Sequence, residues 1–407
     1  MGSIDRREFL RGASVFAAEV AVATLSRVPL PQVVGVGANE AEARARIPQP
    51  YRILPRNNLG NEFKLYQYGS FSFQLYPAVC DIYGLGAIVQ MDKGVLPPPR
   101  DIPIGIIFHY TPLTGELPEE LYWPVLEQAD NVALMERLGV AAINKCVTGK
   151  DRSGLQSLIQ ARILTGCDNN TAKEIVRAAS NGASDSNLAW FLDYLPDKYT
   201  GAVQVKDKFF RSRQFVEPTR GVMPLYKVNL DEILKDTGGA LYITEKPDDI
   251  KPNDISNVCV AWSLDCMVSV SEGDIIHVPY SVKVLKGTKH VKVLPGVSSH
   301  YLGIPDGEQY PYIPKELKKP LGVEAAVIAH MLKLGMRVVV SDFNLQNGAA
   351  LLAAHVAMEL GYTADEAIAA IPSVRDGMIR PKDNDFLKSL EPYPGAMALY
   401  GVSRGTQ

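Results

Sequence analysis

The chain has 407 residues, of which 46% are hydrophobic, and its formal net charge at pH 7 is −3. This length exceeds what one hydrophobic core usually supports, so we expect two domains. The balance of 42 basic against 45 acidic residues excludes a broad basic surface for nucleic acid. An anionic partner must therefore be bound at a local site, which suits a phosphorylated protein or a small phosphorylated substrate.

The N-terminal segment has the pattern of an export signal. Arg6 and Arg7 precede an Ala- and Val-rich run from 13 to 25. This segment resembles a twin-arginine signal, and the alternative is an amphipathic or disordered terminus. No other segment approaches the ~20 apolar residues of a membrane span. The sequence therefore predicts an exported protein, periplasmic or extracellular, with signal and linker at 1–45.

From residue 46 the pattern alternates between strands and helices. Apolar runs predict strands at 85–91, 104–109 and 139–144, and helical spacing predicts helices at 119–138 and 154–164. Such alternation is typical of an α/β domain with a mainly parallel central sheet flanked by helices, in which ligands bind at the carboxyl ends of strands. We assign this first domain to 46–200.

A second alternation follows an irregular interval, 201–254, that we interpret as a connecting segment because it is rich in Lys, Asp and Pro. Strands are predicted at 265–271, 290–294 and 336–340, and helices at 323–334 and 349–360. Twenty positions separate Cys146 from Gly166, and nineteen separate Asp342 from Gly361. We interpret this as a divergent internal duplication, with a second α/β domain at 255–407.

One loop between a predicted strand and a predicted helix carries the chemistry: Cys146-Val147-Thr148-Gly149-Lys150-Asp151-Arg152-Ser153-Gly154. A loop at a helix N-terminus points successive backbone N–H groups at an anion. Cys146 offers a thiolate nucleophile of lowered pKa, Arg152 a planar fork for two phosphate oxygens, and Ser153 a hydroxyl for the sulfur. The phosphate would lie against Val147, Thr148, Gly149, Lys150 and Gly154. The alternative for Cys146 is a small buried apolar residue at a strand end.

This string resembles the Cx5R[S/T] signature of the cysteine-dependent protein tyrosine phosphatase superfamily, and is closest to the bacterial subgroup with GKDR[S/T]G. The likeness covers most of 47–200. It implies a phosphocysteine intermediate, neither metal nor other cofactor, and activity on phosphotyrosine, phosphoserine or phosphothreonine, or phosphoinositides. Lys145 departs from the pattern, because the family has His before the cysteine.

The general acid is the least defined part of the predicted site. The resemblance to the GKDR subgroup makes Asp151 the first choice and Glu116, upstream of the loop, the second. Asp151 has an alternative role as a carboxylate that pairs with nearby lysines or arginines and shapes the loop.

The second half resembles the frame of a dual-specificity phosphatase without its chemistry. Asp342 stands at the cysteine position and Gly348 at the arginine position. A carboxylate there would repel phosphate, so this half is predicted not to catalyse. Asp306 lies in a segment that resembles a general-acid loop, and is either a relic or an acid that reaches across to the first half.

We therefore expect phosphate monoester hydrolysis, with a phytase-like inositol polyphosphate phosphatase as one alternative and a non-catalytic phosphate-binding module as another. The five cysteines fit no metal-binding spacing: Cys80, Cys146, Cys167, Cys259 and Cys266. Their odd number permits two disulfides and one free thiol, for which Cys146 is the candidate.

Overall fold

The computed structural model describes residues 50–372, without 55–63, 70, 93–95, 98–100, 114–115, 181–185, 211–223, 246–257, 260–261, 272–281, 287–288, 294–296, 305–316 and 343–347, and beyond 372 only 385, 388 and 389. The predicted export signal at 1–45 therefore lies outside the described residues. No helix in the described ranges is long and apolar enough to cross a membrane.

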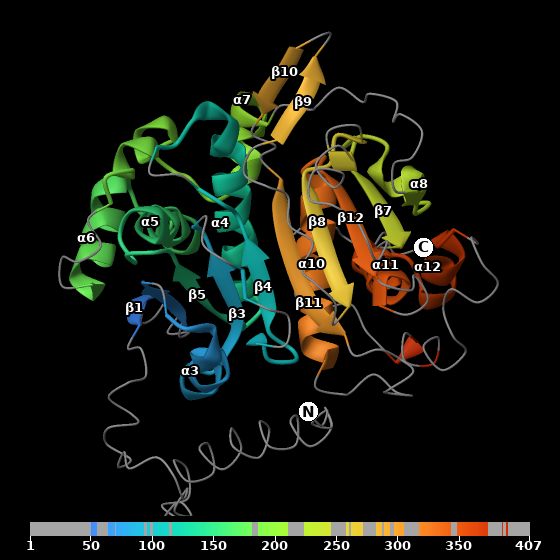
Figure 1. Ribbon diagram of the computed structural model, residues 1–407, viewed down its shortest axis with the longest axis horizontal. Helices are drawn as coiled ribbons and strands as arrows, with labels where there is room; N and C mark the ends of the chain where they lie inside the picture. Colours follow the sequence, from blue (N-terminus) through green and yellow to red (C-terminus); the bar gives the residue numbers. More distant parts are fainter. Residues whose placement is uncertain are drawn as a thin grey trace, which may run out of the picture.

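Ten of the described strands form one sheet, in the order β1-β2-β5-β3-β4-β11-β8-β12-β7-β6 (Figure 1). Their bounds are β1 Tyr51–Leu54, β2 Leu65–Tyr68, β3 Leu85–Gln90, β4 Ile107–Tyr110, β5 Ala141–Lys145, β6 Tyr226–Lys227, β7 Ala240–Glu245, β8 Cys266–Ser271, β11 Ser298–Ile304 and β12 Arg337–Asp342. A separate antiparallel hairpin joins β9 (Val282–Lys286) to β10 (Lys289–Val293).

The α-helices are α3 Tyr76–Tyr83, α4 Tyr122–Arg137, α5 Asp151–Thr165, α6 Asn169–Ala179, α7 Lys206–Phe209, α8 Asp231–Leu234, α10 Lys318–Lys333, α11 Gly348–Glu359 and α12 Ala364–Ala370. Short 3-10 helices are η1 Phe73–Leu75, η3 Glu119–Leu121, η4 Ala189–Tyr194 and η5 Ala202–Val205.

Counted from its outer edge to the centre of the sheet, each half has the same arrangement of strands: β1-β2-β5-β3-β4 in the first half and β6-β7-β12-β8-β11 in the second. In the first half β2, β5, β3 and β4 run parallel, and β1 pairs antiparallel with β2. In the second half β7, β12, β8 and β11 run parallel, and β6 pairs antiparallel with β7. The halves meet where β4 and β11 pair antiparallel, with His109 opposite His300.

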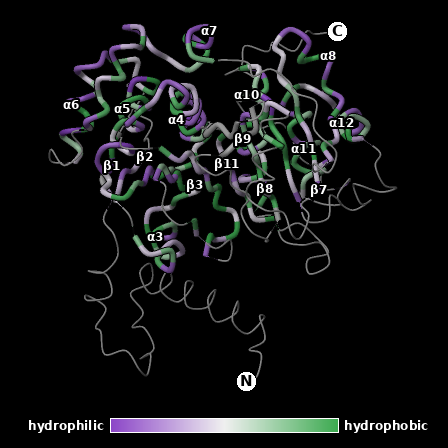
Figure 2. Tube along the Cα trace, turned by 45° about the horizontal axis from the view of Figure 1, so that its top comes forward, coloured by the Kyte–Doolittle hydropathy of each residue, from purple (hydrophilic) through white to green (hydrophobic). Residues whose placement is uncertain are grey.

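One hydrophobic core lies under the helices that cover one face of the whole sheet, since residues of α4, α5, α10 and α11 belong to the same buried cluster. Every residue of α11 is buried, whereas α6 buries only Ala172 and Val176 and is largely hydrophilic in colour (Figure 2). On the other face, α3 covers the first half of the sheet. A third cluster, which includes Tyr242 and Met267, lies in the second half.

The structure confirms a mixed α/β fold with a mainly parallel sheet. The predicted helices are present, and α5 begins at Asp151, three residues earlier than predicted. Sequence reasoning missed β6 and β7, which lie inside the interval assigned to a connecting segment. The run at 290–294 corresponds to β10, which pairs only with β9 and stands apart from the main sheet. Because one sheet spans both halves, the division into two domains stays a prediction.

Candidate active site

The Cys146 loop lies at the carboxyl end of β5, which has β2 on one side and β3 on the other. Residues 147–150 form the bend, and α5 begins directly after it at Asp151. The N-terminal amides of α5 are therefore adjacent to Cys146. This is the strand–loop–helix arrangement that binds anions, and it agrees with the order predicted from the sequence.

The Cys146 thiol is fully buried at the base of the loop. Its Sγ lies 3.2 Å from the hydroxyl oxygen of Ser153. Burial by itself raises the pKa of the thiol. Hydrogen bonds from the Ser153 hydroxyl and main chain, the charge of Arg152 and a bond from the Lys150 main chain outweigh burial and hold the pKa of Cys146 below its usual value of 9.0. The surroundings of Cys146 therefore shift its equilibrium toward the thiolate despite its burial.

Glycine at position 149 allows the loop to rest on the end of β2. Gly149 has φ +68°, and a Cβ there would lie 2.6 Å from the carbonyl carbon of Tyr68. The Gln67 side chain donates a 2.7 Å hydrogen bond from Nε2 to the Gly149 carbonyl. Both the backbone conformation and the close approach require glycine, so β2 determines the shape of the loop.

Arg152 extends from the first turn of α5 toward the segment that follows β4. Its Nη1 donates to the Leu113 carbonyl at 3.3 Å. Leu113 is in turn held to the end of β3, since its N–H donates to the Met91 carbonyl at 3.1 Å. Lys150 and Val147 are exposed at the rim of the loop, and 55% of Val147 is accessible. Lys150 is therefore exposed and Arg152 partly exposed, whereas the sulfur is buried.

The predicted general acids occupy different surroundings. The Asp151 carboxylate accepts a 2.9 Å bond from the Asn187 N–H through Oδ1, and the Ser186 hydroxyl donates to the Asp151 carbonyl at 2.6 Å. Asp151 thus joins the start of α5 to the segment before η4. Glu116 is exposed beyond the end of β4. Asp306 lies outside the described residues.

Two buried polar residues lie at the carboxyl ends of neighbouring strands, Lys145 on β5 and Asp92 after β3. From sequence, Lys145 was noted only as a nearby positive charge and as a departure from the family pattern, and Asp92 was given no role. Lys145 is 1% exposed, and its Nζ donates to the Tyr76 hydroxyl at 2.9 Å and to Gln90 Oε1 at 3.2 Å. The Gln90 amide donates to Asp92 Oδ1 at 3.2 Å. Asp92 is 2% exposed, two residues beyond the end of β3. A polar residue directly after an apolar strand was the only sequence signal for it.

In the second half, the Asp342 carboxylate lies at the carboxyl end of β12 and is bonded to the start of α11. Asp342 Oδ2 accepts hydrogen bonds from the N–H groups of Gly348 at 2.8 Å and Ala349 at 3.3 Å, the first residues of α11. An internal anion therefore already binds the N-terminus of α11.

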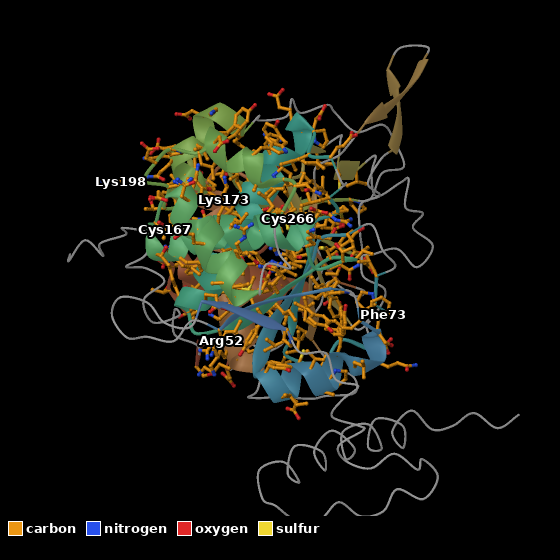
Figure 3. The ribbon with its side chains drawn as sticks, turned by 90° about the vertical axis from the view of Figure 1, so that its left-hand side faces the viewer. Arg52, Phe73, Cys167, Lys173, Lys198 and Cys266 are labelled. Atoms are coloured by element: carbon orange, nitrogen blue, oxygen red, sulfur yellow. The ribbon has the colours of Figure 1, made fainter. Side chains whose placement is uncertain are left out.

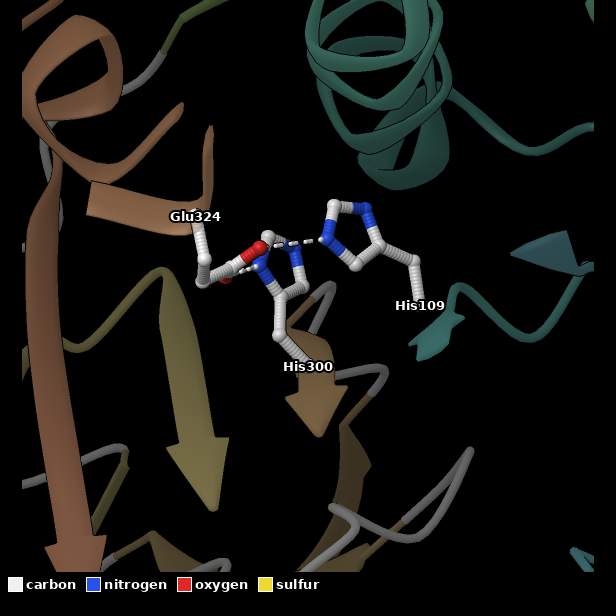
Figure 4. Close-up of side chains that lie close together, drawn as sticks. All are labelled: His109, His300 and Glu324. Carbon is white, nitrogen blue, oxygen red and sulfur yellow. Dashed lines mark hydrogen bonds and ion pairs between the residues drawn. The ribbon is translucent and has the colours of Figure 1, made fainter. Parts of the chain in front are cut away.

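A buried ion cluster connects the halves. His109 Nε2 lies 3.1 Å from Oε2 of Glu324, and His300 Nδ1 lies 2.7 Å from Oε1 (Figure 4). These side chains are close enough to be considered as metal ligands. However, the two rings stack at 3.4 Å with planes 12° apart. A metal about 2.0 Å from each nitrogen would have to lie in both ring planes, and parallel planes offer no such point. In this arrangement the cluster is a hydrogen-bonded ion network.

All five cysteines are described, and each is a free thiol. Burial raises the pKa of Cys80 to about 12 and that of Cys266 well above its usual value, the opposite of the shift at Cys146. Cys167 is partly exposed, on the same side of the molecule as Lys173 and Lys198 (Figure 3). The two disulfides that the count permits are therefore not formed in this structure.

No protein-family model and no curated protein matches the sequence. Among solved structures, human DUSP28 is similar at 17% identity and TM-score 0.30, over 35% of this chain and 92% of that one. The PTP-2 phosphatase of Cydia Pomonella is similar at 15% identity and TM-score 0.30, over 35% and 87%. OH1 from the Orf virus, a tyrosine phosphatase, is similar at 17% identity and TM-score 0.23, over 37% and 90%. Each covers little more than a third of this chain, and none assigns it to a family.

Proposed function

We propose that the chain hydrolyses phosphate monoesters through a phosphocysteine intermediate on Cys146. The observation that carries the proposal is the thiol itself, which is bonded to Ser153 at 3.2 Å beside a helix N-terminus and has a lowered pKa although it is buried. A structural cysteine in an apolar interior has the opposite shift, as Cys80 and Cys266 do.

In the first step the Cys146 thiolate attacks phosphorus, so that the S–P bond forms while the bond to the ester oxygen breaks. The loop amides and Arg152 bind the equatorial oxygens, on which charge accumulates. An acid protonates the departing oxygen. In the second step water attacks phosphorus and gives a proton to the acid that was deprotonated in the first step, the S–P bond breaks, and inorganic phosphate leaves. The Ser153 hydroxyl, 3.2 Å from Sγ, stabilises the thiolate as it departs.

Asp151 is proposed as the acid, because it is the carboxylate within the loop. Its Oδ1 is engaged by the Asn187 N–H, and this bond orients the carboxyl group at the start of α5. Glu116, exposed beyond β4, is the second choice. Asp306 is the third, as an acid from the second half. The variants Asp151→Asn, Glu116→Gln and Asp306→Asn separate the three, since the true acid is required mainly for poor leaving groups.

The proposed substrates are phosphotyrosine and related phosphoproteins or phosphoinositides. An inositol polyphosphate is the alternative, favoured by the exposed ammonium of Lys150 at the rim. We also propose that the chain is a tandem duplication with a non-catalytic second half. The repeated strand order and the carboxylate of Asp342 on α11 support this. Export through the N-terminal twin-arginine pattern is proposed from sequence.

The test is phosphate release from an aryl phosphate, a phosphotyrosyl peptide, a phosphoinositide and inositol hexakisphosphate, with Cys146→Ser and Arg152→Met as paired variants. We expect release from at least one substrate, abolished by Cys146→Ser and reduced by at least ~100-fold by Arg152→Met. Binding of phosphate without release from any substrate would leave the non-catalytic module. Release that persists in Cys146→Ser would contradict the phosphocysteine route.

A further inference from the structure

Lys145 directly precedes the nucleophile, yet its side chain lies on the other face of β5. Successive residues of a strand alternate faces, and the contacts agree: Lys145 reaches Tyr76 on α3, whereas Cys146 contacts Ser153 on α5. The ammonium is therefore not at the opening of the site. It does not meet a substrate directly.

The surroundings of Lys145 hold a cation in the protein interior. Its Nζ lies 5.6, 5.5 and 5.4 Å from the ring centroids of Phe71, Phe73 and Tyr76. Such ring faces attract an ammonium group. Two oxygens accept its hydrogen bonds, from Tyr76 and Gln90. Gln90 also bonds Asp92, so an amide links the buried ammonium to a buried carboxylate.

Main-chain bonds tie this cluster to the loop. The Lys145 carbonyl accepts a 3.0 Å bond from the Met91 N–H, which brings the end of β3 against the residue before Cys146. Gln90 pairs directly with Lys145 in the sheet. Lys145, Gln90 and Asp92 therefore form one hydrogen-bonded group at the carboxyl ends of β5 and β3, and this group is joined to the nucleophile because Lys145 directly precedes Cys146.

Resting on the function proposed above, we propose that Lys145 is a positioning residue for the nucleophile: its buried ammonium stabilises the thiolate of Cys146 from beneath the loop. The role differs from that of Arg152, which lies on α5 and bonds the Leu113 carbonyl. A lysine that only packed against aromatic rings would have no effect on the titration of the sulfur.

The two groups titrate as a pair. Burial lowers the pKa of Lys145 to about 8, and the negative charges of Asp92 and Cys146 act in the opposite direction. Coupling of this kind is reciprocal, so whatever the thiolate adds to the pKa of Lys145, the ammonium removes from that of Cys146. Below pH ~8 the ammonium is present, and above it the charge is lost. The support for the thiolate and for anion binding therefore declines on the alkaline side.

The first test measures the thiolate directly by its absorbance near 240 nm, as the difference between each protein and its Cys146→Ser counterpart across pH. Lys145→Met and Lys145→Gln remove the charge while keeping the length or the polarity of the side chain. We expect the thiol midpoint to rise by about one pH unit, which is about tenfold less thiolate at acidic pH. Lys333→Met is the matched control, because Lys333 is a partly buried lysine of the second half. Its thiol midpoint should equal that of the wild type.

The reciprocal test measures the titration of Lys145 in Cys146→Ser, in which a hydroxyl replaces the thiol. Carbon-13 NMR of the lysine ε-methylene groups should show the Lys145 midpoint near pH 8 in the wild type and lower in Cys146→Ser. An unchanged thiol midpoint in both Lys145 variants, or an unchanged Lys145 midpoint in Cys146→Ser, overturns the proposal. Neither readout requires turnover. If no substrate is hydrolysed but the midpoints shift, the proposed function fails and the coupling stands. If a substrate is hydrolysed but the midpoints do not shift, the proposed function stands and the coupling fails.

Discussion

His109 and His300 stack face to face, with ring centroids 3.4 Å apart, where antiparallel β4 and β11 join the two halves of the sheet. Both rings direct a nitrogen at the carboxylate of Glu324. The Gln128 amide lies 2.9 Å from the other nitrogen of His109. This junction of β4 and β11, called the seam below, thus contains three buried ionisable side chains: His109, His300 and Glu324. The stability of the folded chain must therefore depend on how many protons these side chains bind.

The first prediction concerns acid. Burial and the neighbouring His300 lower the pKa of His109 to about 4, against an opposing effect of Glu324. The unfolded chain binds a proton at His109 near pH 6.5 and the folded chain only near 4, so stability falls as pH falls through that window. From pH 7 to 5 the loss is about 2 kcal/mol. Urea unfolding at both pH values measures it.

Glu127 titrates in the same pH range, so a variant is needed to isolate His109. Burial raises the pKa of Glu127 to about 7, and His300 acts in the opposite direction. The charged groups that act on Glu127 are His300, Asp265 and Asp130. His109→Gln removes the His109 contribution and leaves the opposing one of Glu127, so between pH 7 and 5 the variant should lose about 2 kcal/mol less stability than the wild type. An identical pH slope in the variant and the wild type would show that His109 does not carry the effect.

The second prediction concerns Glu324. Burial opposes its charge, but both histidines hold its pKa well below the usual range. Glu324→Gln removes one of the two carboxylate oxygens that the His109 and His300 rings bond, so one ring nitrogen loses its acceptor in a buried position, which should cost about 2 kcal/mol in unfolding free energy. Glu366→Gln is the control. Glu366 is exposed in the capping box of α12, where glutamine retains the hydrogen bonds, so we expect a change within about 0.5 kcal/mol.

The third prediction concerns Ser153. Removing its hydroxyl in Ser153→Ala takes away the bond to Sγ and should raise the pKa of Cys146. Because the thiolate is the leaving group of the second step, we expect kcat to fall by about tenfold or more, and the phosphocysteine to accumulate. Rapid-mix kinetics with an aryl phosphate should then show a burst of phenol. A slower first turnover without a burst would place the role of Ser153 in attack alone.

The fourth prediction compares two glycines of similar backbone angle. Gly149 has φ +68° and no room for a Cβ, whereas Gly166, the C-cap of α5, has φ +70° and open space around it. Gly166→Ala should cost about 1 kcal/mol of stability and keep activity. Gly149→Ala should displace the loop and lower kcat/KM by at least about tenfold. Equal effects on activity would contradict the role of β2 in shaping the loop.

The fifth prediction concerns the second half. Asp342→Ala should destabilise the chain by about 1 to 2 kcal/mol, because two amides at the start of α11 lose their acceptor. Asp342→Asn keeps an acceptor and should cost less. Turnover of an aryl phosphate should not change in either variant. A loss of turnover at unchanged stability would instead give this loop a part in catalysis.

The predicted nucleophile, its loop and the helix behind it could be found from sequence because they are contiguous. Cys146 and Ser153 are seven positions apart, and a strand followed by a helix brings them into contact by local geometry. The α/β class also followed from local periodicity. The short strand β6 and the strand β7 were missed because an irregular, charged interval surrounds them.

Contacts between segments far apart in the chain could not be predicted, because no local sequence pattern indicates them. His109 and Glu324 are 215 positions apart, and their contact depends on the pairing of β4 with β11. The environment of Lys145 likewise comes from α3, 69 positions earlier, where Tyr76 accepts its hydrogen bond.

Local sequence therefore determined which loop holds the reactive sulfur, since backbone direction and capping act over a few residues. Tertiary structure alone decided that both halves share one sheet, that Lys145 is buried against Tyr76 of α3, and that Asp342 is bonded to α11. Burial and charge act through space, and only the packed chain defines which groups are neighbours.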